Sequence, residues 1–327
     1  MSSETGSSDA LTFEGYCNKV DPNPESFCNV ENTWYGYTPV MWIQVVFSVL
    51  FGVLILAHLV QYVRYFKTRE HFITLAIVCA CGEAAGWIAR CFSSNNPFQR
   101  DPYLAQIICL ILSPVFISAV NYVAFIRTID IMGITWSRIS RKAYVWIFVA
   151  GDLISLIIQA AGGGISATAE TESETDLGKT LMIVGVSVQV LVTGPFLISF
   201  LDYNFRRIRS GKTRGVDPDS NSVHTLAPFN LAILISTIFI LIRCLYRIVE
   251  MSQGWTGYLA VHEVYFAVLD GIMIFVAVAV FVVIHPGKYL PTHPGQEKGS
   301  GLPVHHSNTS SKIQIARTTD SSSEGEK

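Results

Sequence analysis

The chain has 327 residues, of which 50% are hydrophobic and only 15% are charged, and its formal net charge at pH 7 is -2. Soluble globular domains carry about 25% charged residues. This composition therefore excludes an ordinary soluble fold and indicates a protein whose apolar residues face lipid.

Residues 1–37 are a polar arm that precedes the first apolar window. They contain six acidic residues against the single basic Lys19, and no basic stretch followed by an apolar one, so a cleaved signal peptide is not expected. Cys17 and Cys28 lie in this arm. They either form a disulfide, if the arm is outside the cell, or are two free thiols.

Seven apolar windows follow, each long enough to cross a bilayer as a helix. Hydrocarbon offers no water to backbone polar groups, and the windows lack the period-two alternation of membrane strands, so helices are expected rather than a β-barrel. The sequence predicts an all-α polytopic membrane protein, a bundle of seven transmembrane helices within residues 38–289. The expected spans are 39–63, 71–91, 103–127, 143–166, 178–202, 226–250 and 257–284.

Basic residues in short loops predict the orientation, because cytoplasmic loops carry the excess of Lys and Arg. The loops after the first, third and fifth windows hold twelve of them, whereas the opposite side has Lys19, Arg100 and Lys179 and an acidic loop at residues 170–176. We therefore expect the N-terminus outside and the C-terminus in the cytoplasm. The twelve are Arg64, Lys67, Arg69, Arg127, Arg138, Arg141, Lys142, Arg206, Arg207, Arg209, Lys212 and Arg214.

Residues 290–327 are rich in Ser, Thr, Gly and His and show no hydrophobic periodicity. This pattern is typical of a disordered segment. We expect a disordered cytoplasmic tail.

Ionisable and amide side chains inside the windows are the candidate functional residues, because such groups usually face a bundle interior or a water-filled cavity. Three windows carry a pair spaced by seven residues, which places both members on one helical face. These pairs are Glu83 with Arg90, Asp152 with Gln159, and Glu263 with Asp270; Gln189, Arg243, Arg247 and Glu250 complete the set.

Two interpretations of this set stay open. The side chains could line a polar cavity open to the outside, in which unpaired carboxylates bind substrate or exchange protons near neutral pH. Alternatively, they could pair with one another and fix the helices, as Arg247 and Glu263 could across the last two windows. Because five acids face three arginines, pairing cannot neutralise the whole set.

Several activities are excluded or disfavoured. The sequence has no G-x-x-x-x-G-K-[ST] motif for ATP hydrolysis and no nucleophile elbow. The last window has no lysine for a retinal Schiff base. Apart from His71 at the edge of the second window, the histidines within the windows are His58 and His262, too far apart in the chain to predict a metal site. We expect no enzyme activity, no metal and no cofactor.

The order of these residues resembles the fungal lipid-translocating exporters, also described as RTA-like proteins. The likeness covers about residues 35–287. It rests on the order in which several short pieces follow one another, the last of them His285-Pro-Gly287. It adds Gln106 to the candidate site residues. The other pieces are Glu83-Ala-Ala-Gly-Trp-Ile-Ala-Arg90, Pro114 to Tyr122, Asp152, Gln159-Ala-Ala-Gly-Gly-Gly164, Gly185, Gln189, Arg243-Cys-Leu-Tyr-Arg247-Ile-Val-Glu250, Glu263 and Asp270.

The resemblance implies a seven-span fungal membrane protein that exports amphiphilic or lipid-like toxic compounds, such as sphingoid long-chain bases, and contributes to stress resistance. Membrane lipids and an amphiphilic lipid substrate are then the expected partners, the plasma membrane is the expected location, and no nucleic-acid partner is expected. A seven-span lipid sensor or receptor is the alternative, although the chain lacks the D-R-Y and N-P-x-x-Y motifs of G-protein-coupled receptors. The sequence does not determine the oligomeric state.

Overall fold

The computed structural model describes Cys17, Val20, Cys28, Thr33 and residues 35–66, 71–132, 137–138, 140–169, 171–210, 221–253 and 257–289. By its internal contacts the chain divides into residues 1–291 and residues 292–327. All described residues belong to the first unit. The expected tail at 290–327 and most of the expected arm at 1–37 lie outside the described residues.

The described chain is helical, with seven helices long and apolar enough to cross a membrane. This confirms the predicted all-α bundle of seven spans, and the protein is an integral membrane protein. The first three are α2 (Met41–Arg64), α3 (Thr74–Asn95), which follows the 3-10 turn η3 (His71–Ile73), and α4 (Arg100–Met132); the fifth and sixth are α7 (Glu172–Ser210) and α8 (Asn221–Ser252).

The fourth and seventh spans are composite, because each contains a π-helical segment. The fourth runs through α5 (Arg141–Tyr144), the π-helix η5 (Val145–Val149) and α6 (Ala150–Thr168). The seventh runs through α10 (Glu263–Phe266), the π-helix η6 (Ala267–Ile272) and α11 (Met273–Val283), and the short α12 (Pro286–Tyr289) follows it. The helical turn α9 (Tyr258–Val261) is separated from this span by the extended backbone of His262.

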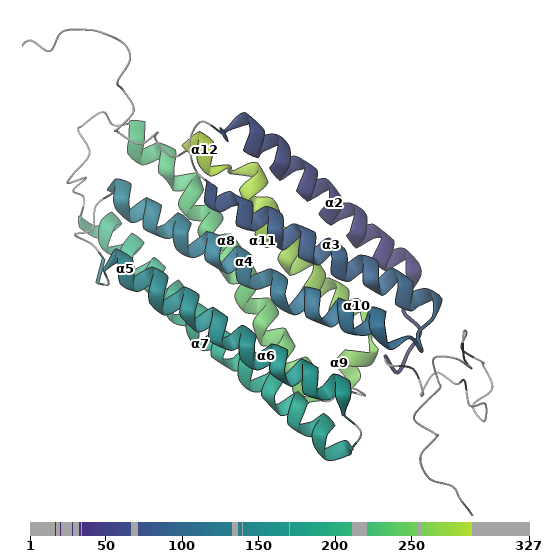
Figure 1. The fold of residues 1–327 in the computed structure, drawn as a ribbon. Helices are drawn as coiled ribbons and strands as arrows, with labels where there is room; N and C mark the ends of the chain where they lie inside the picture. Colours follow the sequence, from purple (N-terminus) through teal and green to yellow (C-terminus); the bar gives the residue numbers. More distant parts are fainter. Residues whose placement is uncertain are drawn as a thin grey trace, which may run out of the picture. The chain divides into compact units, whose positions relative to one another are not determined.

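The spans lie side by side along one direction (Figure 1). Helix α3 packs against α2 and α4, α6 packs against α7, and α8 contacts α4, α7 and α11. The start of α2 and the end of α3 lie at the same end of the bundle as α9 and α10 (Figure 1). Arg90, near the end of α3, and Glu263, at the start of α10, thus belong to segments at the same end of the bundle.

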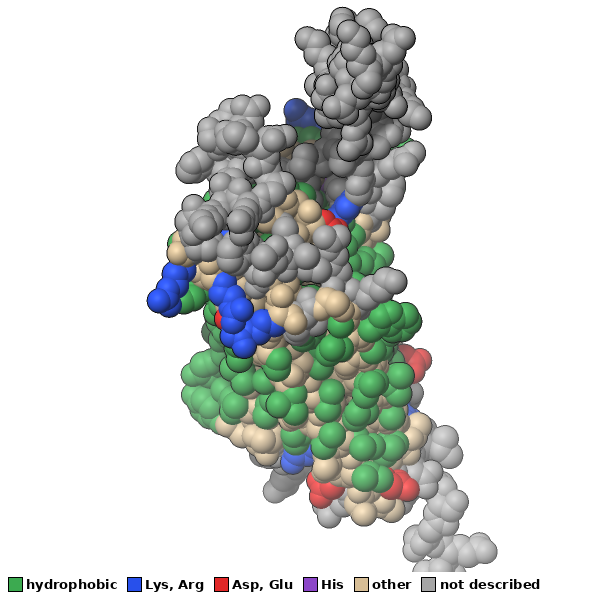
Figure 2. Space-filling view, turned by 90° about the vertical axis from the view of Figure 1, so that its left-hand side faces the viewer, with side chains coloured by type: hydrophobic (Ala, Val, Ile, Leu, Met, Phe, Trp, Pro, Cys, Tyr) green, Lys and Arg blue, Asp and Glu red, His purple; other side chains and the backbone are tan. Residues whose placement is uncertain are grey.

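Large apolar side chains cover the outside of the bundle. Examples are Trp42, Val60, Leu191 and Val283, each at least 67% exposed. Figure 2 shows a broad hydrophobic band on one face, with most of the visible Lys and Arg side chains above it and acidic side chains at its lower end. A surface of this kind is stable only against lipid, since water would be in contact with a large apolar area.

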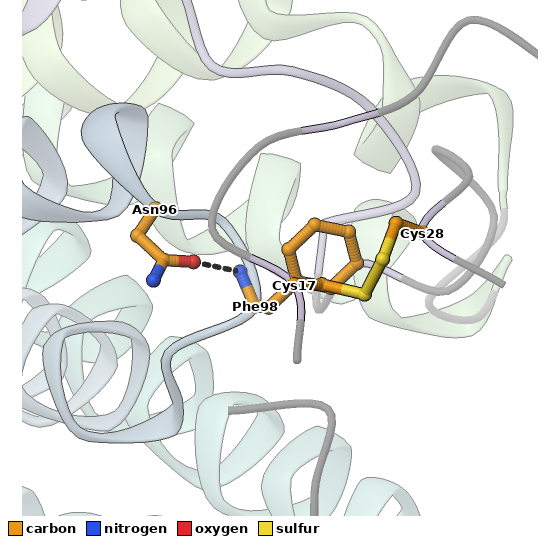
Figure 3. Close-up of a disulfide and its surroundings, with 4 residues drawn as sticks. All are labelled: Cys17, Cys28, Asn96 and Phe98. Carbon is orange, nitrogen blue, oxygen red and sulfur yellow. Dashed lines mark hydrogen bonds between the residues drawn. A yellow bond between two sulfur atoms is a disulfide. The ribbon is translucent and has the colours of Figure 1, made fainter. Parts of the chain in front are cut away.

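A disulfide joins Cys17 and Cys28. Figure 3 shows it in the surroundings of Asn96 and Phe98, in the loop between α3 and α4. The side chain of Phe98 is fully buried and that of Cys17 nearly so, and the backbone N–H of Phe98 donates to Asn96 Oδ1 at 3.2 Å. The described part of the arm is therefore packed against the bundle.

The contact between α6 and α7 generates a prediction about stability. A Cβ at Gly162 would lie 2.7 Å from the carbonyl oxygen of Gly178 and 2.8 Å from the amide nitrogen of Met182, whereas a Cβ at Gly163 would meet nothing within 4 Å. We expect Gly162→Ala to destabilise the protein by about 1–3 kcal/mol, because both obstructing atoms belong to the backbone and one helix must move.

Gly163→Ala is the matched control, since the same substitution one residue later only improves helix propensity, by up to about 1 kcal/mol. Thermal unfolding of the purified protein in detergent measures both changes. Equal midpoints for the two variants would contradict the close contact.

Candidate functional site

The first charged contact joins α3 to α10. Arg90 donates to Glu263 Oε1 from Nη2 at 3.1 Å and from Nε at 3.3 Å, and the side chains are only 2% and 6% exposed. Glu263 also accepts hydrogen bonds from the backbone N–H of Val40 at 2.8 Å and from Gln44 Nε2 at 2.6 Å. This carboxylate is thus held by two separate parts of the chain, the start of α2 and the end of α3.

Two tyrosines just before α2 cover this pair. Tyr37 accepts a hydrogen bond from Arg90, and Tyr35 donates to Gln106 Oε1 at 2.6 Å. The Arg90 guanidinium lies 5.0 Å from the centre of the Tyr35 ring, within the range of cation–π attraction. Burial raises the pKa of Tyr35 to about 12 and raises that of Tyr37 as well, against the opposing effect of the Arg90 charge. Both phenols are therefore neutral at pH 7.

Sequence reasoning did not single out these tyrosines. Their position, directly before the first span, is where aromatic residues often mark the membrane interface. Nothing in that pattern indicates that they bind an arginine two spans away.

The second charged contact centres on Asp270, in the π-helix η6. Its Oδ1 lies 2.8 Å from Arg243 Nε and 2.9 Å from Arg247 Nε. Arg247 also pairs with Glu250 at 3.0 Å, and Tyr246 donates to Glu250 at 3.1 Å. One carboxylate of the seventh span thus contacts two arginines of α8, and Glu250 supplies the second negative charge.

These contacts correct the pairing suggested by the sequence. The sequence suggests Arg247 and Glu263 as one possible pair. In the structure Glu263 binds Arg90, and Arg247 binds Asp270 and Glu250. Glu263 and Asp270 bind different partners, because the π-helix η6 begins between them and contains Asp270, which changes their angular offset.

Two carboxylates stay outside these ion pairs. Glu83 is fully buried, and neither of its oxygens has a hydrogen-bond partner. The charges that act on it most strongly are those of Arg243, Asp270 and Arg247. Asp152 is 1% exposed and accepts one hydrogen bond, from Tyr122 at 2.9 Å on Oδ2, while Oδ1 has none.

The remaining candidates form an amide ladder between α6 and α7. Gln159 Nε2 donates to Ser155 Oγ at 2.7 Å and to Gln189 Oε1 at 3.4 Å. Ser155 in turn donates to the carbonyl oxygen of Gly185 at 2.7 Å. Asp152, Ser155 and Gln159 are spaced by three and four residues, so they share one face of α6.

A groove of about 540 Å³ lies between α4 and the last turns of α6. Ile107, Ile111 and Ala167 are among its apolar lining residues, and Gln159 is the only candidate site residue that lines it. Glu83, Asp152 and Asp270 do not line this groove and are at most 1% exposed, so this groove is not the outward-open polar cavity that the sequence suggests. The structure has these carboxylates enclosed by packed helices.

The Arg90–Glu263 contact generates a prediction. Arg90→Gln should destabilise the protein by about 3–5 kcal/mol, because it leaves the Glu263 carboxylate buried without its cation. The double variant Arg90→Gln/Glu263→Gln should recover part of this loss, since neither charge is then left unpaired. Thermal unfolding of the purified protein compares both variants with the wild type.

Arg138→Gln is the control, because Arg138 pairs with Asp202 at 2.9 Å but is 67% exposed. An exposed pair contributes about 0–1 kcal/mol. If Arg90→Gln and Arg138→Gln lowered the unfolding midpoint equally, the buried pair would have no special structural role.

Comparison with known proteins places this arrangement in a family. A family model described as "RTA1 like protein" matches residues 76–293. The chain is 29% identical to "Sphingoid long-chain base transporter RSB1" of Saccharomyces cerevisiae, over 92% of this chain and 86% of the relative. It is also 31% identical to "Protein RTM1" (66% and 68%) and 33% identical to "Protoporphyrin uptake protein 1" (62% and 64%), both of Saccharomyces cerevisiae.

No solved structure gives a significant match to the chain. The family model nevertheless covers well over half of the 327 residues, including the six candidate-bearing spans α3 to α11. The protein therefore belongs to the RTA1-like family.

Proposed function

We propose that this protein is a transporter that moves amphiphilic lipids with an amine head group, of the sphingoid long-chain base type, out across the plasma membrane. The Saccharomyces cerevisiae relative named as a sphingoid long-chain base transporter aligns with 92% of the chain and supports this substrate class. Export of such compounds would contribute to stress resistance. The expected orientation, with the arm outside and the tail at 290–327 in the cytoplasm, is part of the proposal.

The observation that carries the proposal is the pair of buried carboxylates that take part in none of the described ion pairs. The three arginines Arg90, Arg243 and Arg247 are all engaged by Glu263, Asp270 and Glu250. Glu83 and Asp152 are left over. A buried carboxylate is costly unless it is paired or protonated, so each of the two is suited to an incoming ammonium group.

The comparison of paired and unpaired charges also favours a cationic substrate over an anionic one. A porphyrin carries carboxylates, which would need an arginine that is not already paired. Among the charged candidate site residues, the two that are in no ion pair, Glu83 and Asp152, are both acidic. This argues for an amine here, although one relative is named for protoporphyrin uptake.

The groove between α4 and α6 suits the hydrocarbon chain of such a substrate. Its volume of about 540 Å³ lies within the range of ligand pockets, about 300–1,000 Å³. Gln159 lines it, and Ser155 and Asp152 follow on the same face of α6. A hydroxylated amine head group could pass along these side chains while the chain stays in the apolar groove.

Proton exchange is the proposed energy source. The sequence has no P-loop for ATP hydrolysis. A buried carboxyl group is neutral when protonated, and an ammonium group neutralises it equally well once the proton has left. Binding of one amine at Glu83 or Asp152 would thus release one proton, and the two species would compete for the same oxygen atoms.

Replacement of the two unpaired carboxylates tests the proposal. We expect Glu83→Gln and Asp152→Asn to slow transbilayer movement of a fluorescent long-chain base at least about tenfold in liposomes containing the purified protein, because the ammonium loses its buried counter-charge. Both substitutions remove charge at nearly constant shape and leave the three arginine pairs intact.

Asp202→Asn is the matched control, since this acid binds the exposed Arg138 and the neighbouring Arg206 at the end of α7, and it should transport normally. If both Glu83→Gln and Asp152→Asn moved the long-chain base at the wild-type rate, the proposed site would be wrong. A wild-type protein that binds the base without moving it across the bilayer would overturn transport and support the lipid sensor instead.

A further inference from the structure

A second groove, of about 500 Å³, lies at the other end of the bundle, between the end of α2 and the end of the seventh span. None of its lining residues belongs to the ion pairs described above or to the proposed transport path. Its lining combines an apolar part, including Val60 and Val283, with Gln61, Arg64, His285 and Lys288. Val60 and Val283 are respectively 67% and 77% exposed, so this part of the groove faces the hydrocarbon of the membrane.

The motif His285-Pro-Gly287 builds one wall of this groove. The ring of His285 stacks on Tyr65 with centroids 4.8 Å apart, and His285 Nδ1 accepts a hydrogen bond from the backbone N–H of Gly287 at 3.1 Å. A Cβ at Gly287 would lie 2.7 Å from Tyr65 Cβ. Only glycine therefore fits at this position while the stack with Tyr65 is kept.

This geometry leaves a buried donor and a buried acceptor without partners. His285 is 96% buried, and its Nε2 has no hydrogen-bond partner. Because Nδ1 acts as an acceptor, the neutral ring carries its proton on Nε2. On α2, Gln61 Nε2 donates to the carbonyl oxygen of Val282 at 2.6 Å, while Gln61 Oε1 has no partner. Both unpartnered atoms, His285 Nε2 and Gln61 Oε1, belong to residues that line the groove.

We propose that this groove binds the head group of an anionic phospholipid, with an acyl chain along Val60 and Val283. The phosphate oxygens meet the charges of Arg64 and Lys288 and accept a hydrogen bond from His285 Nε2. A hydroxyl or ammonium group of the head group donates to Gln61 Oε1. The site thus provides a partner for each kind of atom that such a head group presents.

The location of the groove fits this ligand. It lies at the end of the bundle that carries the basic loops, where anionic lipids are concentrated if the expected orientation holds, because the cytoplasmic leaflet is rich in them. A cationic long-chain base would be repelled by Arg64 and Lys288. The bound lipid is therefore distinct from the transported one, and it would bridge α2 and α12.

Native mass spectrometry of the purified full-length protein tests the site, with phosphatidylserine, phosphatidylcholine and inorganic phosphate as the probes. We expect phosphatidylserine to bind well above phosphatidylcholine, and Arg64→Gln/Lys288→Gln to weaken it roughly 20-fold, since each basic group near an anionic head group contributes about fivefold. His285→Asn should also weaken it, because Asn keeps an acceptor for the Gly287 N–H but lacks the Nε2 donor.

Arg206→Gln/Arg209→Gln is the matched control, as it removes the same charge from the end of α7 outside the groove, and it should bind phosphatidylserine normally. Three outcomes would overturn the proposal: wild-type binding in Arg64→Gln/Lys288→Gln, an equal loss in the control, or displacement of the lipid by inorganic phosphate alone. The measurement involves no transport, so its failure would leave the proposed function untouched.

Discussion

Charge neutrality in the closely packed interior of the bundle is the constraint on which this structure depends. An arginine or carboxylate enclosed among packed helices has no solvent to stabilise it, so a counter-charge or a proton must lie within contact distance. Arg90 satisfies this rule through Glu263, which joins α3 to α10. Arg243 and Arg247 satisfy it through Asp270, which joins α8 to the seventh span. The positions of three helices relative to one another are thus tied to the positions of a few charges.

The same constraint separates structural from functional carboxylates. Removal of Glu263 or Asp270 would expose an arginine to an apolar interior, so a variant at either position reports on folding before it reports on transport. Glu83 and Asp152 differ, because no arginine relies on them in the described ion pairs. Substitutions at these two positions are therefore the informative ones, a distinction that residue type alone does not make.

The seven spans, and the inward face of those spans that carry spaced charged or amide side chains, were accessible from the sequence, since hydropathy and residue spacing depend only on local geometry. The pairing of the charges was not. Which arginine meets which acid depends on the crossing of helices from distant parts of the chain, as in the contact between Arg90 and Glu263. The same holds for Tyr35 and Tyr37, whose roles arise from the packing of the arm against α3 and α4. No periodic pattern carries that information.

The π-helical segments explain where the periodic argument failed. Residues seven apart share a face in an α-helix, but η6 begins between Glu263 and Asp270, contains Asp270 and has a wider turn. Glu263 is consequently directed to Arg90, while Asp270 is directed to α8. A similar segment, η5, ends three residues before Asp152. Both π-helices thus adjoin a buried carboxylate, and π-helical turns are common at functional sites because they re-aim a side chain at a cost in helix stability. In this bundle the π-helical segments occur where an acid is directed at particular partners. Asp270 is directed at two arginines, and Asp152 at Tyr122.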